Sequence, residues 1–287
     1  EAINEIYLVD DVPSYRKLAD MAEEVQNSVE TVQLTVRFSD REYVDGVDID
    51  RKTFYEMLIE SDELPTTSQP SPEAFKKLFR TLKNGEQAVV ITISSKLSGT
   101  YQSACIAAED FPGIFVVDSG TTSVGQGIIV ELALSLSQKG LSAKEIADRL
   151  DREKEKITVV ALVDTLEYLK KGGRISKTVA VAGTVLNIKP VICLNDGVIG
   201  VLGKARGSKQ GNNLLVREIE KSGGIDFSRP VMLGYTGISD ALLLKYIEDS
   251  KWLWQERLDR VRYSQIGSVV GTHAGPGAVA VAFFKNN

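Results

Sequence analysis

The strongest constraint on the fold is an alternation of short β-branched runs with helical patterns along the 287-residue chain. Consecutive strands separated by a helix pair in parallel, because the helix carries the chain back to the starting edge of the sheet. The pattern therefore predicts an α/β protein. We expect strands at residues 5–9, 31–38, 87–93, 114–117, 157–163, 189–194, 198–203, 230–235, 259–265 and 278–284. We expect helices at residues 15–27, 51–61, 71–82, 99–109, 123–138, 143–154, 164–171, 209–222 and 239–250.

The second half of the chain contains a hairpin signal and so departs from a purely parallel pattern. Asp196 and Gly197 stand between two apolar runs, and this pair supplies the positive φ angles of a tight type I′ turn. A chain of this length holds one large or two medium domains, and the charged end of the helix at 143–154 is typical of a connector. We expect residues 1–156 to form an α/β domain with a largely parallel sheet flanked by helices, and residues 157–287 to form a mixed-sheet α/β domain.

Composition and charge argue against several classes of protein. The chain has 43% hydrophobic and 25% charged residues, as in ordinary globular proteins. Its net charge of −5 argues against a large nucleic-acid surface, which normally shows a basic excess. Cys105 and Cys193 lie far apart in apolar neighbourhoods, as expected for reduced thiols in the cytoplasm. The longest apolar stretches fall short of the roughly 18 residues that a membrane span needs, so we expect a cytoplasmic protein with no transmembrane helix.

Two polar segments lie beside predicted strands, where open α/β sheets tend to place their ligand sites. Residues 65–72 (PTTSQPSP) open a helix, and residues 94–101 (SSKLSGTY) follow a strand and lead into the next helix. Hydroxyl groups and free backbone N–H groups at such a place can bind a carboxylate or a phosphate. Both segments are equally compatible with ordinary helix caps. The residues of interest are Thr67, Ser68, Ser98, Gly99 and Thr100.

Two further segments contain groups that suit an anion. Residues 271–277 (GTHAGPG) hold Thr272 and the only histidine, His273, in what we expect to be a glycine-rich loop before the last strand. Imidazole can donate a hydrogen bond to a carboxylate. Arg174 follows a Gly-Gly pair that ends a helix, and its planar guanidinium either lies in solvent or anchors an anion.

The residue inventory argues against most common enzyme classes. One histidine and two separated cysteines do not supply a His/Cys metal site, so we expect no metal, although a carboxylate-held magnesium stays open. The sequence has no Gly-x-x-x-x-Gly-Lys-Ser/Thr phosphate loop, no Gly-x-Gly-x-x-Gly after the first strand, and no Gly-x-Ser-x-Gly elbow. A hydrolase using Ser98 and His273 remains an alternative, but no acidic partner for the histidine is identified.

Taken in order, four of these motifs resemble the DegV family. Each motif is weak alone, but their order and spacing together are specific, and the resemblance covers nearly the whole chain. The four motifs are 67–72 (TSQPSP), 95–101 (SKLSGTY), 166–175 (LEYLKKGGRI) and 271–277 (GTHAGPG), and further similar stretches lie at 38–47 (FSDREYVDGV) and 186–190 (LNIKP). The chain departs from the family at 8–14 (LVDDVPS), where relatives usually carry a Thr-Asp-Ser-like turn, so the role of this first loop stays open.

The resemblance implies a two-domain fold with a buried tunnel between the domains that holds a long-chain fatty acid, such as palmitate, stearate or oleate, without a cofactor. It also implies that the protein carries its ligand and does not catalyse a reaction. The fatty acid carboxylate would meet the hydroxyl loop at Thr67, the serine Ser98 and the histidine His273, with Arg174 supporting that network. The expected ligand-binding residues are Thr67, Ser68, Ser98, Gly99, Thr100, Arg174, Thr272 and His273. Candidate tunnel walls lie around Ile93, Leu162, Ile192 and Phe283.

The resemblance further implies a bacterial protein that works with a separate fatty acid kinase. Arg206 is similar to the exposed basic position through which family members meet this kinase. The kinase would transfer phosphate from ATP to the bound acid and give an acyl phosphate for phospholipid synthesis. We expect the carrier itself to be a monomer. The alternatives are a Ser/His acyl hydrolase and an interaction module that does not require lipid.

Overall fold

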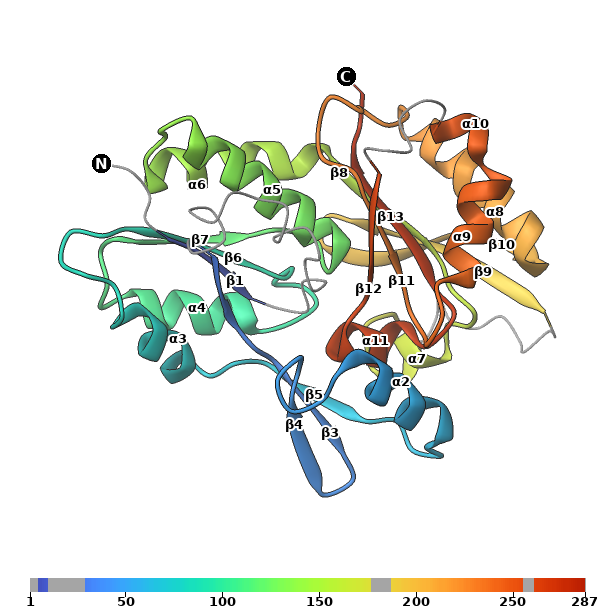
Figure 1. Ribbon diagram of the computed structural model, residues 1–287, viewed down its shortest axis with the longest axis horizontal. Helices are drawn as coiled ribbons and strands as arrows, with labels where there is room; N and C mark the ends of the chain where they lie inside the picture. The colour runs from blue at the N-terminus through green and yellow to red at the C-terminus, as the bar shows by residue number, and fades with distance from the viewer. Residues whose placement is uncertain (1–4, 10–28, 177–186, 255–260, 287) are drawn as a thin grey trace.

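The computed structural model describes residues 5–9, 29–176, 187–254 and 261–286 (Figure 1). Its strands are β1 (Glu5–Val9), β2 (Val29–Val32), β3 (Thr35–Phe38), β4 (Arg41–Val44), β5 (Thr66–Ser68), β6 (Ala88–Thr92), β7 (Ile114–Asp118), β8 (Ile157–Leu162), β9 (Ile188–Asn195), β10 (Val198–Arg206), β11 (Met232–Tyr235), β12 (Arg262–Gln265) and β13 (Val279–Phe284). Its α-helices are α2 (Arg51–Glu60), α3 (Pro72–Phe79), α4 (Thr100–Ala108), α5 (Val124–Gln138), α6 (Ala143–Glu153), α7 (Glu167–Lys171), α8 (Gly207–Lys221), α9 (Ala241–Asp249), α10 (Lys251–Trp254) and α11 (Ser268–Ala274).

The strands form three sheets, and the α/β prediction is confirmed. A four-stranded sheet of order β2-β1-β6-β7 is parallel throughout. A six-stranded sheet of order β10-β9-β8-β13-β11-β12 is mixed, with a parallel pair only between β11 and β12. Strands β4, β3 and β5 make a small antiparallel sheet. Every strand of the six-stranded sheet follows residue 156, while the division of the chain into domains at that point stays a prediction.

The parallel sheet is buried on both faces, as its continuous apolar strands require. On β6, Val89 and Ile91 pack in one apolar cluster with α5 and α6. Ala88 and Val90 point the other way and pack with α3 and α4. Figure 1 shows these two helix layers on opposite sides of the sheet.

The six-stranded sheet also uses its two faces differently, because successive side chains of a strand point to opposite sides. On β8, Val160 and Leu162 pack under α8 and α9 on the outer face. Val159 and Ala161 lie on the inner face, in the apolar cluster that includes the start of α5. The inner face is the one that borders the cavity described below.

Helix α5 lies between the two large sheets (Figure 1). Ile129 and Ala133 pack in the cluster of the parallel sheet, whereas Val124 and Ile128 pack in the cluster of the six-stranded sheet. The residues in the first two turns of α5 are mostly buried, whichever way they point. This is expected for a helix packed on all sides, which is apolar around its whole circumference. The helix thereby joins the two halves of the chain.

Several details of the predicted elements are settled by the structure. The hairpin is confirmed, with Asp196 and Gly197 at φ angles of 48° and 75° between antiparallel β9 and β10. The single strand predicted at 31–38 is wrong, because it divides into β2 and β3, which join different sheets. The helix predicted at 15–27 and the first loop at 10–13 lie outside the described residues.

The loop predicted at 271–277 is also wrong in its first half, because helix α11 runs through Ala274. The first N–H groups of this helix, at Ser268 and Val269, donate to the Asp45 carboxylate at 3.2 Å each. An anion at a helix N-terminus satisfies its unpaired donors. This cap comes from a residue more than 200 positions away, so the sequence around the helix does not predict it.

Helix α11 is also held by α2. The Tyr55 hydroxyl donates to the Ile266 carbonyl at 2.9 Å, in a buried hydrogen bond. The two helices approach closely at Gly271, where a methyl group would lie 2.5 Å from the Tyr55 hydroxyl oxygen and 2.9 Å from a ring carbon of Phe54. Both rings are fully buried and have little room to move.

We therefore expect Gly271→Ala to destabilise the protein by about 1–3 kcal/mol, because the added methyl overlaps with buried rings. Urea unfolding measures the loss. The matched control is Gly200→Ala, where the added carbon would meet only the Cys193 sulfur at 3.5 Å, an ordinary contact. Equal stability of the two variants would contradict the tight α2–α11 packing.

Candidate functional site

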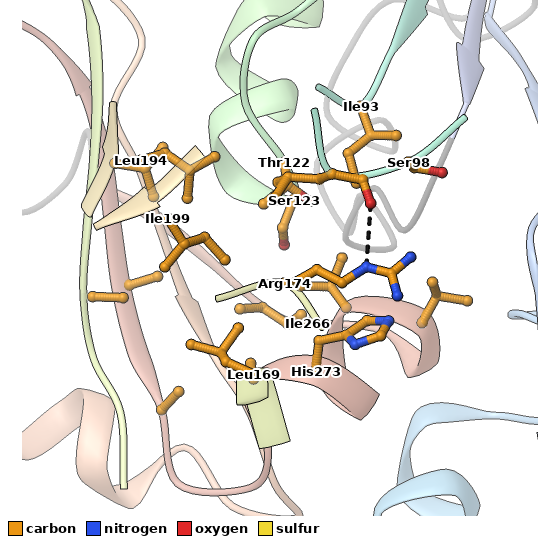
Figure 2. A pocket seen from close by; sticks show the side chains of 18 of the residues that line it. Ile93, Ser98, Thr122, Ser123, Leu169, Arg174, Leu194, Ile199, Ile266 and His273 are labelled. Carbon is orange, nitrogen blue, oxygen red and sulfur yellow. Dashed lines mark hydrogen bonds between the residues drawn. The ribbon is translucent and has the colours of Figure 1, made fainter. Parts of the chain in front are cut away.

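A cavity lies between the inner face of the six-stranded sheet and the loops that follow β6 and β7. Most of its lining is aliphatic, and its polar groups are few. Figure 2 shows Ile93, Leu169, Leu194, Ile199 and Ile266 around this space, with Ser98, Arg174 and His273 toward one side. Further apolar lining residues are Val159, Ala161, Val163, Ile192, Ala278 and Ala280.

The polar side of the cavity brings together residues from four separate segments. Thr67 comes from β5, Ser98 from the loop after β6, Arg174 from the turn after α7 and His273 from α11. The Thr67 hydroxyl oxygen lies 2.9 Å from His273 Nε2. Each of these four side chains is half-buried, so the polar groups lie at the mouth of the cavity and not at its depth.

Arg174 is held by backbone carbonyls. Its Nε donates to the Leu97 carbonyl at 3.2 Å, as the dashed line in Figure 2 shows, and its Nη1 donates to the Gly172 carbonyl at 2.7 Å. Partial burial lowers the pKa of Arg174, but a guanidinium keeps its charge in proteins. No acidic side chain in the described part of the chain forms a salt bridge with it. The site therefore presents a positive charge that lacks a carboxylate partner.

His273 is neutral in this setting. Burial, followed by the nearby charge of Arg174, lowers the pKa of His273 from its ordinary value of 6.5 to about 4. Its Nδ1 is buried and has no hydrogen-bond partner among the described residues. The ring packs against the end of α7 at Gly172, where any side chain would meet Nδ1. A neutral imidazole can still donate one N–H bond to an anion.

Ser98 and its neighbours divide into lining and supporting residues. The Ser98 hydroxyl lies 2.8 Å from that of Thr100, which is fully buried behind it and does not line the cavity. Gly99 faces Gln69, whose side chain fills the space where a Cβ would be. Ser68 borders the cavity beside Thr67.

Of the remaining predicted residues, some lie away from the cavity and others line it. Thr272 sits on the buried side of α11, and its hydroxyl donates to the Ser268 carbonyl at 2.9 Å, so it completes a hydrogen bond within the helix. Arg206 is exposed at the start of α8, as predicted for a surface position. Of the tunnel candidates, Ile93 and Ile192 line the cavity. Leu162 and Phe283 point to the opposite face and pack in the outer cluster.

Sequence reasoning missed the lining residues between β7 and α5, at Thr122 and Ser123. Their only signal in the sequence is a run of hydroxyl residues after a strand, because the topology that brings this turn to the cavity is not visible in the pattern.

Comparison with known proteins agrees with this architecture. Residues 18–286 match the model of a family described as uncharacterised proteins of the DegV family. This chain belongs to the DegV family. A DegV domain-containing protein of Caldanaerobacter subterraneus subsp. tengcongensis is 35% identical over 274 residues, which cover 93% of this chain and 95% of the relative.

Two solved structures share the fold over nearly their whole length. The first is a DegV family protein from Thermus thermophilus described for its fatty acid binding, with 30% identity, coverage of 99% of this chain and 100% of that chain, and a TM-score of 0.84. The second is a stearic acid-binding protein from Eubacterium ventriosum, with 28% identity, coverage of 99% and 98%, and a TM-score of 0.85.

Two further properties of the DegV chain bear on the site. Within residues 5–9, 29–176, 187–254 and 261–286, no group of three or more His, Cys, Asp or Glu side chains is placed to hold a metal ion. Over the same ranges, no helix combines the length and the apolar character that a bilayer span needs.

His273 offers a direct test of the site, because it is the only histidine and gives a single set of ring signals in NMR. We expect the lipid-free protein to titrate with a midpoint near pH 4 and the unfolded chain near 6.5. Between these values the unfolded chain binds a proton that the folded chain does not, so the free energy of unfolding falls as the pH drops through that window. His273→Gln should lose less stability there. A folded-state midpoint at or above 6.5 would contradict the burial of the ring.

Proposed function

We propose that this DegV protein binds a long-chain fatty acid, with the carboxylate at Thr67, Ser98, Arg174 and His273 and the acyl chain in the apolar cavity. The observation that carries the proposal is the positive charge of Arg174, without a carboxylate partner among the described residues, at the mouth of a cavity whose walls are mostly aliphatic. A ligand complementary to both features has one anionic end and a long apolar remainder.

The apolar walls favour a long chain over a short one. Burying a methylene group contributes about 0.8 kcal/mol, so each added carbon strengthens binding until the cavity is filled. The carboxylate would otherwise be costly to bury, but hydroxyl, guanidinium and imidazole donors together can satisfy its oxygens. A neutral His273 suits this role, because it donates a hydrogen bond without adding a second buried charge next to Arg174.

The arrangement favours a carrier over the Ser/His hydrolase. The Ser98 hydroxyl is hydrogen-bonded to Thr100, and His273 Nε2 is bonded to Thr67. Nucleophilic catalysis needs the serine within hydrogen-bond reach of its base, and the base oriented by a third group. These partners support a role for both side chains as a polar anchor instead.

The carrier proposal is tested by mass spectrometry of protein that is first stripped of lipid and then mixed with stearate. We expect one fatty acid per chain, and affinity losses of roughly ten- to a hundredfold for Ser98→Ala and His273→Ala, since each removes a hydrogen bond to a charged group. Ser95→Ala is the matched control, because Ser95 is exposed in the same loop and does not line the cavity. Failure of the unmodified protein to bind stearate would overturn the proposal.

We further propose that the bound acid is presented to a separate fatty acid kinase, which phosphorylates it to an acyl phosphate. The half-buried position of the anchor residues supports this step, because a carboxylate held there lies near the surface. Arg206 is exposed on β10 at the start of α8 and supplies a basic contact for a partner. The ATP-dependent reaction and the two free cysteines, Cys105 and Cys193, both fit the cytoplasm.

The partner step is tested with Arg206→Glu. In a mixture with a bacterial fatty acid kinase, ATP and stearate, we expect acyl phosphate formation to fall at least about tenfold, as a reversed charge at an interface disfavours association. Stearate retention should not change, because Arg206 does not line the cavity. Lys139→Glu is the control, since it reverses an exposed charge at the end of α5. Equal loss in both variants would argue against a contact at Arg206.

A further inference from the structure

Thr122 and Ser123 form a polar corner in the wall of the cavity, at the turn between β7 and α5. Ser123 is only 3% exposed, and its hydroxyl oxygen has no hydrogen-bond partner among the described residues. The Thr122 hydroxyl oxygen is likewise buried without a partner there. Figure 2 shows the two residues together at the cavity wall, with the Ser123 side chain directed toward the interior.

The backbone of Ser123 is strained in a way that keeps the side chain in this direction. Its φ and ψ angles of 51° and −123° lie in a region that residues other than glycine rarely adopt. The surrounding contacts hold it there. Gly127 donates its N–H to the Ser123 carbonyl at 2.9 Å, Gly125 donates to the Thr122 carbonyl at 3.0 Å, and a methyl on Gly125 would lie 2.1 Å from the Thr121 hydroxyl oxygen.

The surroundings of this corner are apolar. Val124 follows it directly and packs with Val159 in the inner-face cluster, with Ile199 against the same cluster. The corner belongs to a segment that contributes none of the four proposed carboxylate anchors. A hydroxyl buried among aliphatic groups is costly unless it forms a hydrogen bond, and an unsubstituted methylene chain cannot provide one.

We propose that the cavity prefers fatty acids that carry an oxygen substituent, a hydroxyl or a carbonyl, along the acyl chain. The inference rests on the proposed fatty acid site and assigns Thr122 and Ser123 as the polar partners of that substituent. Each hydroxyl can donate to the ligand oxygen, and each can accept from a ligand hydroxyl. The strained turn holds these groups in place before the ligand binds, so little ordering is needed on binding.

The test is a competition in which lipid-free protein is offered stearate together with 3-hydroxystearate, 10-hydroxystearate or 12-hydroxystearate, and the bound ratio is measured by mass spectrometry. We expect at least one hydroxy acid to be preferred by about five- to tenfold, the effect of one added hydrogen bond. Thr122→Val keeps the side-chain shape, and Ser123→Ala removes only the oxygen. The preference should fall toward unity in these variants, while stearate binding is retained.

Two controls separate this inference from the proposed function. Ser98→Ala should weaken the binding of both acids together, because it acts on the shared carboxylate. Ile199→Val changes the cavity wall without changing its polarity and should leave the ratio unaltered. Stearate binding with no preference for any of the three hydroxy acids would overturn the inference and leave the carrier proposal intact. Failure to bind any of the acids would overturn both.

Discussion

Arg174 links the two walls of the cavity mouth. Its guanidinium donates to Leu97, in the loop after β6, and to Gly172, at the end of α7, so the two segments are held at a set separation. Because carbonyls and not carboxylates hold the group, its positive charge is left uncompensated by any salt bridge among the described residues. The same interaction therefore shapes the mouth of the cavity and makes it attractive to an anion.

The rest of the site follows from how the two sheets are placed around α5. One face of β8 and β9 packs under α8, while the other is free to border the cavity. The parallel sheet directs the loops after β6 and β7 toward the same space, as expected for the carboxyl ends of parallel strands. Helix α11 then closes the site with His273, and Asp45 and Tyr55 fix that helix from the other half of the chain.

Residue patterns predicted the elements well where local signals are strong. The start of the helix predicted at 71–82, the hairpin at Asp196 and the periodic helices all agree with the structure, because each depends on neighbouring residues. The predictions were wrong where contacts between residues far apart in the sequence determine the structure. The stretch at 31–38 reads as one β-branched run, yet Gln33 and Leu34 separate strands of two different sheets.

The sequence by itself determined the family, the α/β class and the segments that meet at the polar side of the cavity, since these depend on residue types in order along the chain. It could not decide which hydroxyls face the cavity, because a one-residue change of phase sends a strand side chain to the opposite face. Leu162 and Ile192 are both apolar strand residues, and only the packed sheets place one outside and the other at the cavity. The Ser123 hydroxyl, which has no partner within the described part of the chain, likewise owes its position to the tertiary structure, since a strained turn and its neighbours direct it inward.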